Sequence, residues 1–268
     1  MPEEFKSRLP ELEVSPDMQI GKDQVLVSVK GGYGWTDIMT IGNISTIIGK
    51  AKSRKTFFMT LLVSGVITNR NVFFKSGLLK NRVVLFDTEQ GKYHVWKMTK
   101  RIQDMVGNFP ENIRVFGLRP LSVIERIQEI ENYLYLNDVK LVVIDGIRDL
   151  VTDINSAEQA TEIVGKLMKW SYERECHICS VLHQNKADDN ARGHIGTEIV
   201  NKSETVIQVA KPKAKDKAKE ISVVTSVYTR GQEMQDFQFK IDNGIPVIQT
   251  NGKADEYLEP DKDEEQPF

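Results

Sequence analysis

Gly49-Lys50-Ala51-Lys52-Ser53-Arg54-Lys55-Thr56 is the stretch that decides the fold. It directly follows the β-branched run at 44–48 and precedes a long apolar stretch. Gly49, Lys55 and Thr56 fit the pattern G-x-x-x-x-G-K-[ST], in the strand–loop–helix context that the pattern needs. Backbone N–H groups of such a loop wrap phosphates and place them at a helix N-terminus. The stretch therefore predicts nucleotide binding; a Lys-rich turn before a helix is the alternative.

In this pattern the ammonium group of Lys55 reaches the β- and γ-phosphates, and the hydroxyl of Thr56 holds Mg²⁺. Arg54 stands where the pattern has its second glycine. Its side chain must point away from the nucleotide or add a positive charge beside it. We expect ATP to contact the whole loop and the residue after it: Gly49, Lys50, Ala51, Lys52, Ser53, Arg54, Lys55, Thr56 and Phe57.

Apolar runs typical of buried strands recur along the chain, at 44–48, 82–86, 113–117, 140–145 and 177–182. Stretches with helical period lie between them, at 123–134, at 160–168 and, more weakly, at Trp96, Ile102 and Val106. This alternation indicates a parallel sheet buried on both faces. The later runs at 204–210, 221–228 and 235–241 leave no room for helices. We therefore expect the sheet to end in antiparallel strands.

Composition narrows the class of protein further. The chain has 268 residues, 40% hydrophobic and 28% charged, which is typical of a globular domain. It contains no apolar run of about 20 residues and no apolar segment at its N-terminus, so we expect neither a membrane span nor a secretory signal. Two cysteines exclude a disulfide scaffold and favour the cytoplasm. Cys176 and Cys179 lie in a predicted buried strand, and we expect core cysteines rather than a zinc site.

The chain divides into three predicted segments. Residues 1–37 form an arm with a single strand at 24–29, residues 38–250 form the main domain, and residues 251–268 form an acidic disordered tail. The tail carries seven acidic residues against two lysines, so the rest of the chain has a net charge of +3. A mobile loop with five lysines is expected at 211–219, as a contact for a phosphate backbone or as a solubilising loop.

Two other predicted strands end in carboxylates. Asp87 and Glu89 follow the run at 82–86, and Asp145 follows Leu141–Ile144. The carboxyl edge of a parallel sheet is where ligands bind in open α/β folds. One of these carboxylates could polarise a water molecule for attack on a γ-phosphate. The alternative is that Asp87 caps the following helix and Glu89 lies on its solvated first turn. Asp145 has the Walker B form and is expected to hold Mg²⁺ together with Thr56.

A polar segment follows the strand predicted at 177–182. Gln184 is placed to sense a γ-phosphate by hydrogen bonding. The loop at 185–196 carries Lys186, Arg192 and His194 between its glycines. It is either a DNA-facing loop or a plain mobile one.

These parts, in this order, resemble the RecA-like ATPases, and most closely the single-domain, RepA-like hexameric helicases of plasmids and mobile elements. The likeness covers about residues 38–250 and rests on the phosphate loop, D-T-E-Q at 87–90, V-V-I-D at 142–145, H-Q-N-K at 183–186, R-G-H-I-G at 192–196 and Thr229-Arg230-Gly231. It implies a three-layer α/β/α fold with a mainly parallel central sheet that ends in antiparallel strands.

The resemblance also implies roles for single residues. Glu89 would be the catalytic carboxylate and Gln184 the γ-phosphate sensor, acting together with Lys55. Arg230 would reach into the site of the neighbouring subunit of a ring, such as a hexamer. Single-stranded DNA would meet the loop at 185–196, through Lys186, Arg192 and His194.

Two classes of function remain in competition. The first is a cytoplasmic ATPase that acts on DNA, as a replicative helicase or a DNA-remodelling enzyme of a plasmid or mobile element. The second, motivated by Arg54, is a nucleotide-binding regulatory or DNA-binding module with little or no hydrolysis. A small-molecule P-loop kinase needs neither a strand-end glutamate nor late antiparallel strands.

The last residues suggest a partner. Pro267-Phe268 after a run of acids resembles the C-terminal tip of bacterial single-stranded-DNA-binding proteins, which docks on replication proteins. A terminal aromatic ring and carboxylate can enter a basic-rimmed apolar pocket. The tail could also fold back on the Lys-rich loop, or act only as a solubilising end.

Overall fold

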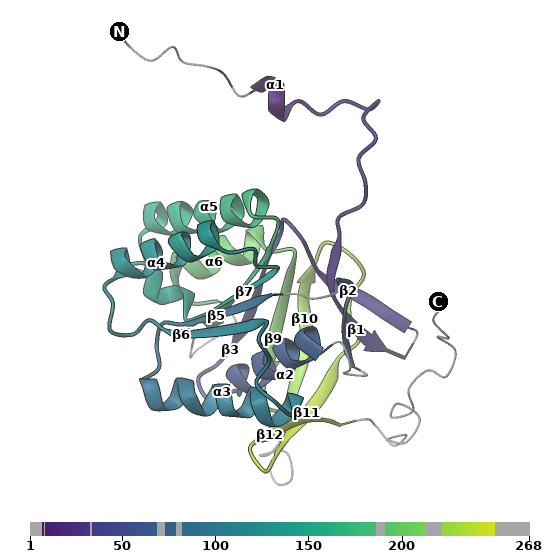
Figure 1. Ribbon diagram of the computed structural model, residues 1–268, viewed down its shortest axis with the longest axis vertical. Helices are drawn as coiled ribbons and strands as arrows, with labels where there is room; N and C mark the ends of the chain where they lie inside the picture. Colours follow the sequence, from purple (N-terminus) through teal and green to yellow (C-terminus); the bar gives the residue numbers. More distant parts are fainter. Residues whose placement is uncertain are drawn as a thin grey trace.

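A computed structural model of the protein describes residues 7, 9–32, 34–68, 73–78, 82–185, 191–212 and 221–249 (Figure 1). Three of the sequence predictions concern residues outside these ranges. They are the DNA contact of Lys186, most of the Lys-rich loop at 211–219, and the acidic tail at 251–268.

A nine-stranded sheet with the order β12-β11-β10-β9-β3-β8-β7-β5-β6 forms the centre of the molecule (Figure 1). All strand pairs from β9 to β6 are parallel, and β9 to β12 pair antiparallel with one another. The strands are β3 (Ile44–Gly49), β5 (Val83–Asp87), β6 (Ile113–Gly117), β7 (Leu141–Asp145), β8 (His177–His183), β9 (Thr205–Ala210), β10 (Ile221–Thr229), β11 (Phe237–Asp242) and β12 (Ile245–Gln249). The predicted sheet, mainly parallel with an antiparallel end, is confirmed.

Helices cover both faces of this sheet and complete the three-layer α/β/α fold (Figure 1). One face carries α2 (Lys55–Thr68) and α3 (Lys92–Val106); the other carries α4 (Val123–Leu136), α5 (Ala157–Glu173) and α6 (Gly193–Lys202). Side chains of β5 alternate between the two layers, since Val83 and Leu85 pack with α2 and α3 while Val84 and Phe86 pack with α4 and α5. Because both faces are buried, such a strand reads as a continuous apolar run.

The buried stripe of α3 differs from the prediction. Trp96 is 53% exposed, whereas Val95, Met98 and Ile102 are buried. The buried positions follow the i, i+3, i+7 spacing, and Trp96 lies one position outside it. Its indole stacks instead on the ring of Tyr93, with the centroids 5.8 Å apart.

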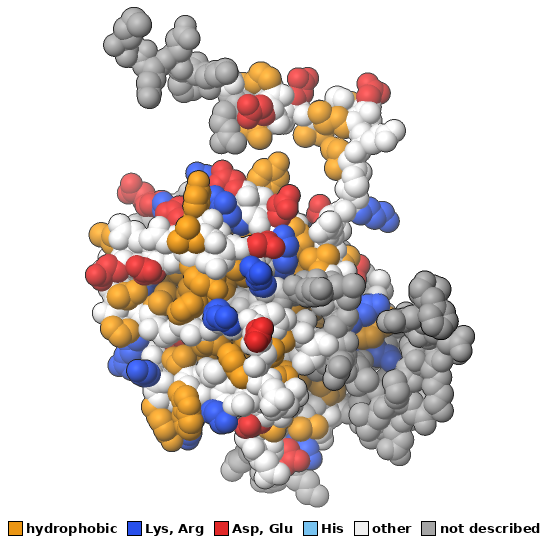
Figure 2. All heavy atoms as spheres, viewed as in Figure 1, with side chains coloured by type: hydrophobic (Ala, Val, Ile, Leu, Met, Phe, Trp, Pro, Cys, Tyr) orange, Lys and Arg blue, Asp and Glu red, His pale blue; other side chains and the backbone are white. Residues whose placement is uncertain are grey.

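The prediction of a single strand in the N-terminal arm is wrong. β1 (Val25–Gly31) pairs antiparallel with both β2 (Gly34–Thr40) and β4 (Phe74–Ser76), and the three strands form a second sheet. Leu26, Met39 and Phe74 are fully buried against the α2 layer. The predicted boundary at residue 38 therefore falls inside β2. Among the described residues of the arm, those at 9–24, with the short helix α1 (Leu9–Leu12), stand apart from the body (Figures 1 and 2).

Two smaller predictions concern the core and membrane spans. Cys176 and Cys179 are free and buried, as predicted, and burial raises the pKa of each thiol to about 12. No described helix is long and apolar enough to cross a membrane.

A buried histidine ties the two sheets together. His177 opens β8 with its side chain fully buried. Its Nδ1 donates to the carbonyl oxygen of Thr40 at 2.7 Å, and its Nε2 accepts from the hydroxyl of Ser45 at 2.8 Å. The carbonyl oxygen can only accept, so Nδ1 carries the proton, and in the neutral ring Nε2 accepts from the hydroxyl of Ser45. Burial accordingly lowers the pKa of His177 to about 4.

The free energy of unfolding should therefore depend on this residue below neutral pH. His177 binds a proton near pH 6.5 in the unfolded chain but only near pH 4 in the folded one, so stability is lost as the pH falls between these values. The loss amounts to about 3 kcal/mol for a shift of this size. Urea unfolding of wild type and His177→Gln between about pH 7 and pH 4 tests this. The variant should show a flatter decline; equal slopes would contradict the prediction.

Candidate functional site

The parallel register brings four strand ends to one edge of the sheet. Gly49 of β3 lies beside His183 of β8, and Asp145 of β7 lies beside Asp87 of β5. A pocket of about 540 Å³ opens at this edge. It is lined by Lys52, Ser53, Arg54, Lys55, Thr56, Phe57, Glu89, Gln90, His94, Lys97, Met98, Arg101, Asp145 and His183.

The predicted phosphate loop turns tightly between β3 and α2. A Cβ atom at Gly49 would lie 2.3 Å from the carbonyl oxygen of Val209 and 2.6 Å from Ser53 Oγ, so only glycine fits. Lys52 and Arg54 both have positive φ angles, 62° and 75°. The amides of Phe57 and Phe58 donate to the carbonyl oxygen of Arg54 and begin the helix. The loop thus ends at a helix N-terminus that faces the pocket, an arrangement that favours anions.

The backbone explains why the phosphate-loop pattern has glycine where this chain has Arg54. A φ of 75° lies in the left-handed region, which costs residues with a Cβ about 1–2 kcal/mol. The guanidinium group reaches β10, where Nη1 donates to Ser222 Oγ at 3.3 Å, while the residue also lines the pocket. The side chain of Arg54 is thus directed toward β10 and forms part of the pocket wall.

The strain at this position is testable with two matched substitutions. Arg54→Gly and Arg54→Ala both remove the guanidinium group, but only glycine relieves the left-handed backbone. We expect the free energy of unfolding of Arg54→Gly to exceed that of Arg54→Ala by about 1 kcal/mol in urea denaturation. Equal stabilities would show that the loop relaxes away from this conformation without cost.

Lys55 is the buried cation of the pocket. It is 7% exposed, and its Nζ donates to the carbonyl oxygens of Gly49 at 2.8 Å and Lys50 at 3.1 Å. Nζ also lies 3.1 Å from Nδ1 of His183. Burial lowers the pKa of Lys55 to about 8, against the opposing effects of Asp145 and Glu89. The ammonium group is therefore held at the base of the loop, charged at neutral pH.

Thr56 and Asp145 meet as the predicted metal-binding pair. The hydroxyl of Thr56 donates to Asp145 Oδ2 at 3.2 Å. Burial, with the nearby charge of Asp87, raises the pKa of Asp145 to about 7. Hydroxyl and carboxylate oxygens are the ligands that Mg²⁺ prefers, and a divalent cation would offset the cost of burying the carboxylate. The donor set therefore fits Mg²⁺.

One loop hydroxyl has unused hydrogen-bonding capacity. Ser53 Oγ is buried and makes no hydrogen bond within the described residues, although Ser53 lines the pocket. A buried polar group without a partner costs about 1–3 kcal/mol. A phosphate oxygen in the loop would supply such a partner.

The two carboxylates after β5 have different surroundings. Asp87 is fully buried and accepts from the amides of Glu89 (3.1 Å) and Gln90 (2.7 Å) and from the Gln90 side chain (2.8 Å). Asp87 shapes the turn between β5 and α3, but Gly91 is the N-cap of α3 and no side chain of the described residues caps that helix, so the alternative that Asp87 caps it is wrong. Glu89 precedes α3 and extends into the pocket, where its Oε2 lies 3.4 Å from Nε2 of His183. That hydrogen bond is the main reason that the pKa of Glu89 is lowered.

His183 takes the place in the pocket that we expected for Gln184. Gln184 is buried, and its side chain is outside the pocket lining. The backbone N–H of Gln184 donates to the carbonyl oxygen of Gly49. His183 lines the pocket instead and was not among the predicted site residues. Successive residues of a strand face opposite sides, so the sequence indicates that only one of His183 and Gln184 faces the pocket. Which of the two it is depends on the orientation of β8 in the sheet.

Helix α3 also lines the pocket, with His94, Lys97 and Arg101. The sequence could not predict these residues, because the packing of α3 beside the phosphate loop is set by the tertiary structure.

The segment predicted as a DNA-facing loop is partly helical. α6 begins at Gly193, with φ of 76°, so residues 193–196 belong to a helix and not to a loop. Gly193 fits where a Cβ atom would lie 2.6 Å from the carbonyl oxygen of Ile154. Arg192 and His194 lie at this helix start, at least partly open to solvent.

Arg230 lies far from the pocket of its own chain. It follows β10, whose Thr229 pairs with Thr205, and Thr205 pairs with Ser45 at the start of β3. The phosphate loop lies at the other end of β3. Arg230 Nη2 donates to the carbonyl oxygen of Lys202 at 3.2 Å. Within one chain, then, the structure does not bring Arg230 together with Lys55 and Glu89.

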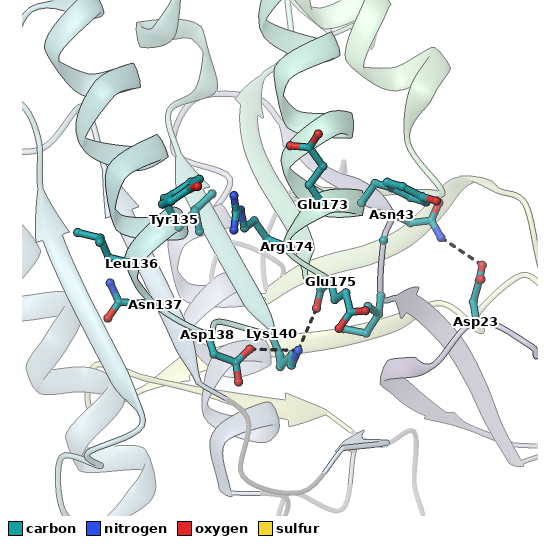
Figure 3. A pocket seen from close by; sticks show the side chains of 14 residues that line it. Asp23, Asn43, Tyr135, Leu136, Asn137, Asp138, Lys140, Glu173, Arg174 and Glu175 are labelled. Atoms are coloured by element: carbon teal, nitrogen blue, oxygen red, sulfur yellow. Dashed lines mark hydrogen bonds and ion pairs between the residues drawn. The ribbon is translucent and has the colours of Figure 1, made fainter. Parts of the chain in front are cut away.

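A second cavity, of about 860 Å³, lies at the end of the sheet opposite the phosphate loop, and Figure 3 shows the side chains that line it. It is bordered by the C-terminal ends of α4 and α5 and the turn before β3. The cations of this cavity already have partners. Arg174 packs on the ring of Tyr135 at 4.2 Å. Lys140 Nζ lies 3.1 Å from Asp138 Oδ1 and donates to the carbonyl oxygen of Glu175. The groups suited to phosphate chemistry are gathered in the first pocket.

Comparison with known proteins identifies the class. The structure is similar to a solved ATPase domain, with a TM-score of 0.58 at 15% sequence identity, over 78% of this chain and 85% of that one. A family model described as "AAA domain" matches residues 33–189. Curated proteins gave no match.

The fold and the phosphate-loop pocket define a P-loop domain of RecA-like fold. The chain belongs to the AAA domain family, because the matched residues are more than half of its length. Nucleotide binding is the property that this class shares.

Proposed function

We propose that this protein hydrolyses ATP and acts on DNA, as a replicative helicase or DNA-remodelling ATPase of a plasmid or mobile element. One observation supports hydrolysis above all others. A buried lysine, a hydroxyl–carboxylate pair and a pocket-facing glutamate surround one cavity at the mouth of a phosphate loop. Phosphoryl transfer asks for such positioning and charge stabilisation rather than covalent chemistry.

Each of these side chains has a proposed part. Lys55 exchanges its contacts with the carbonyl oxygens of Gly49 and Lys50 for the β- and γ-phosphates. The loop amides also bind these phosphates, and Ser53 completes the cradle. Thr56 and Asp145 hold Mg²⁺, which when bound neutralises charge on the phosphates. Glu89 orients the attacking water and accepts its proton. Gln184, buried behind the loop, responds to the γ-phosphate through its contact with Gly49 rather than by touching the nucleotide.

The places of three basic residues in the fold support DNA binding and ring assembly. The backbone N–H of Arg192 donates to the carbonyl oxygen of His183 at 3.1 Å, and His194 follows at the start of α6, so a DNA contact through these two residues would lie close to the pocket. On the face shown in Figure 2, basic and acidic side chains of the described residues are interspersed, so this face offers no broad basic surface for DNA. Because Arg230 is remote from its own pocket, we assign it to the site of a neighbouring subunit.

The alternative function is a nucleotide-dependent module with little or no turnover. It is favoured by Arg54, which keeps a cation and a strained backbone within the phosphate loop. ATP turnover with and without single-stranded DNA, combined with sizing in ATP, separates the two. Turnover by an oligomer that rises with DNA supports the motor; ATP binding without turnover supports the module.

The shared site predicts complementation between two inactive variants. Arg230→Ala should spare ATP binding and lose turnover, as should Glu89→Gln. In a mixed ring, some interfaces join an intact Glu89 to an intact Arg230, so the mixture should regain part of the wild-type turnover. Co-assembled mixtures that stay inactive would count against a shared site.

A further inference from the structure

His183 connects two side chains that the proposed function uses. It is the last residue of β8 and lines the phosphate-loop pocket. Nδ1 of its ring lies 3.1 Å from Lys55 Nζ, and Nε2 lies 3.4 Å from Glu89 Oε2. One imidazole ring thus spans the distance from the buried cation to the exposed carboxylate.

The chemistry of Lys55 decides which nitrogen of this ring carries the proton. An ammonium group has three N–H donors and no acceptor. Lys55 directs two of them to the carbonyl oxygens of Gly49 and Lys50, and the third contact is Nδ1 of His183. Nδ1 must then be the unprotonated nitrogen. The proton of the neutral ring lies on Nε2, which can donate to Glu89.

Glu89 needs such a contact. It lies in the turn between β5 and α3, and its side chain is 58% exposed, so packing restricts its rotamer little. A hydrogen bond to Oε2 restricts the carboxylate and leaves its second oxygen able to accept a proton from water. The same bond favours the ionised form, in keeping with the lowered pKa of Glu89.

We propose that His183 is a positioning residue, which uses its contact with Lys55 to hold the Nε2–H tautomer and thereby orients the carboxylate of Glu89. This inference rests on the proposed hydrolysis of ATP. His183 touches neither phosphate nor metal in this role. A change at His183 should therefore alter the rate of the chemical step and leave the affinity for the nucleotide nearly unchanged.

Three substitutions divide the two contacts of the ring. The amide nitrogen of His183→Gln can occupy the position of Nε2 and still donate to Glu89. The amide of His183→Asn reaches only the position of Nδ1, near Lys55, and His183→Ala removes both contacts. Since small misplacements of a catalytic group are costly, we expect kcat to fall on the order of tenfold in the Asn and Ala variants. KM for ATP should change less than about twofold, and His183→Gln should keep most of the wild-type kcat.

A second measurement does not depend on turnover. Nitrogen NMR of ¹⁵N-histidine-labelled, nucleotide-free protein should show the Nε2–H tautomer for His183, and Lys55→Met should give a mixture of tautomers. The chain has four histidines, so His183→Gln assigns the signal. An Nδ1–H tautomer in wild type would overturn the inference, as would a kcat of His183→Gln as low as that of His183→Asn. A wild type without ATP turnover would refute the proposed hydrolysis, and the tautomer would then decide alone whether this chain of contacts exists.

Discussion

Lys55→Ala is expected to abolish tight ATP binding. Lys55 is buried at the base of the phosphate loop. Its ammonium group donates to the carbonyl oxygens of Gly49 and Lys50. Removing one partner of a buried, hydrogen-bonded charge pair costs about 2–5 kcal/mol. The affinity for ATP should therefore fall on the order of 100-fold or more, as measured by calorimetry.

The matched control keeps the packing and removes only the charge. Lys55→Met retains the unbranched side chain, so its loss of affinity should be close to that of Lys55→Ala, with a smaller loss of stability. Urea unfolding shows whether either variant is folded. Lys169→Ala, which alters an exposed lysine on α5, should bind ATP like wild type. Unchanged ATP affinity in a folded Lys55→Ala protein would refute the assignment of this pocket.

Glu89→Gln should separate binding from turnover. The amide has nearly the shape of the carboxylate but cannot accept a proton from water, and general-base catalysis is worth about 10²–10⁴-fold. We expect kcat to fall by at least about 100-fold while the affinity for ATP stays within a few-fold of wild type. Steady-state turnover and calorimetric titration measure the two quantities.

The control for this variant is a second neutralised carboxylate. Glu129 is exposed on α4, on the other face of the sheet. The variant Glu129→Gln should therefore leave kcat unchanged. If Glu89→Gln hydrolyses ATP at the wild-type rate, the side chain belongs only to the turn before α3. The water would then have to be oriented by another group of the pocket.

The sequence determined the features that depend on neighbouring residues. The runs at 83–87 and 141–145 are apolar at every position but the last, so they could only be buried strands with a carboxylate at the sheet edge. Gly49, Lys55 and Thr56 form one continuous turn into a helix, and the spacing alone predicted where that turn would lie. The fold class and most of the phosphate site could be predicted for this reason.

The tertiary structure decided the features that depend on phase and pairing. β2 mixes polar and apolar residues and becomes a strand because β1 and the α2 layer bury one side of it. The order of strands places Arg230 at the edge opposite Gly49, which no local pattern encodes. The phase of β8 turns His183 rather than Gln184 into the pocket, and the contacts of His183 with Lys55 and Glu89 join residues far apart in the sequence. Packing of the sheet and its helices fixes such contacts, because local preferences limit each segment but not its neighbours.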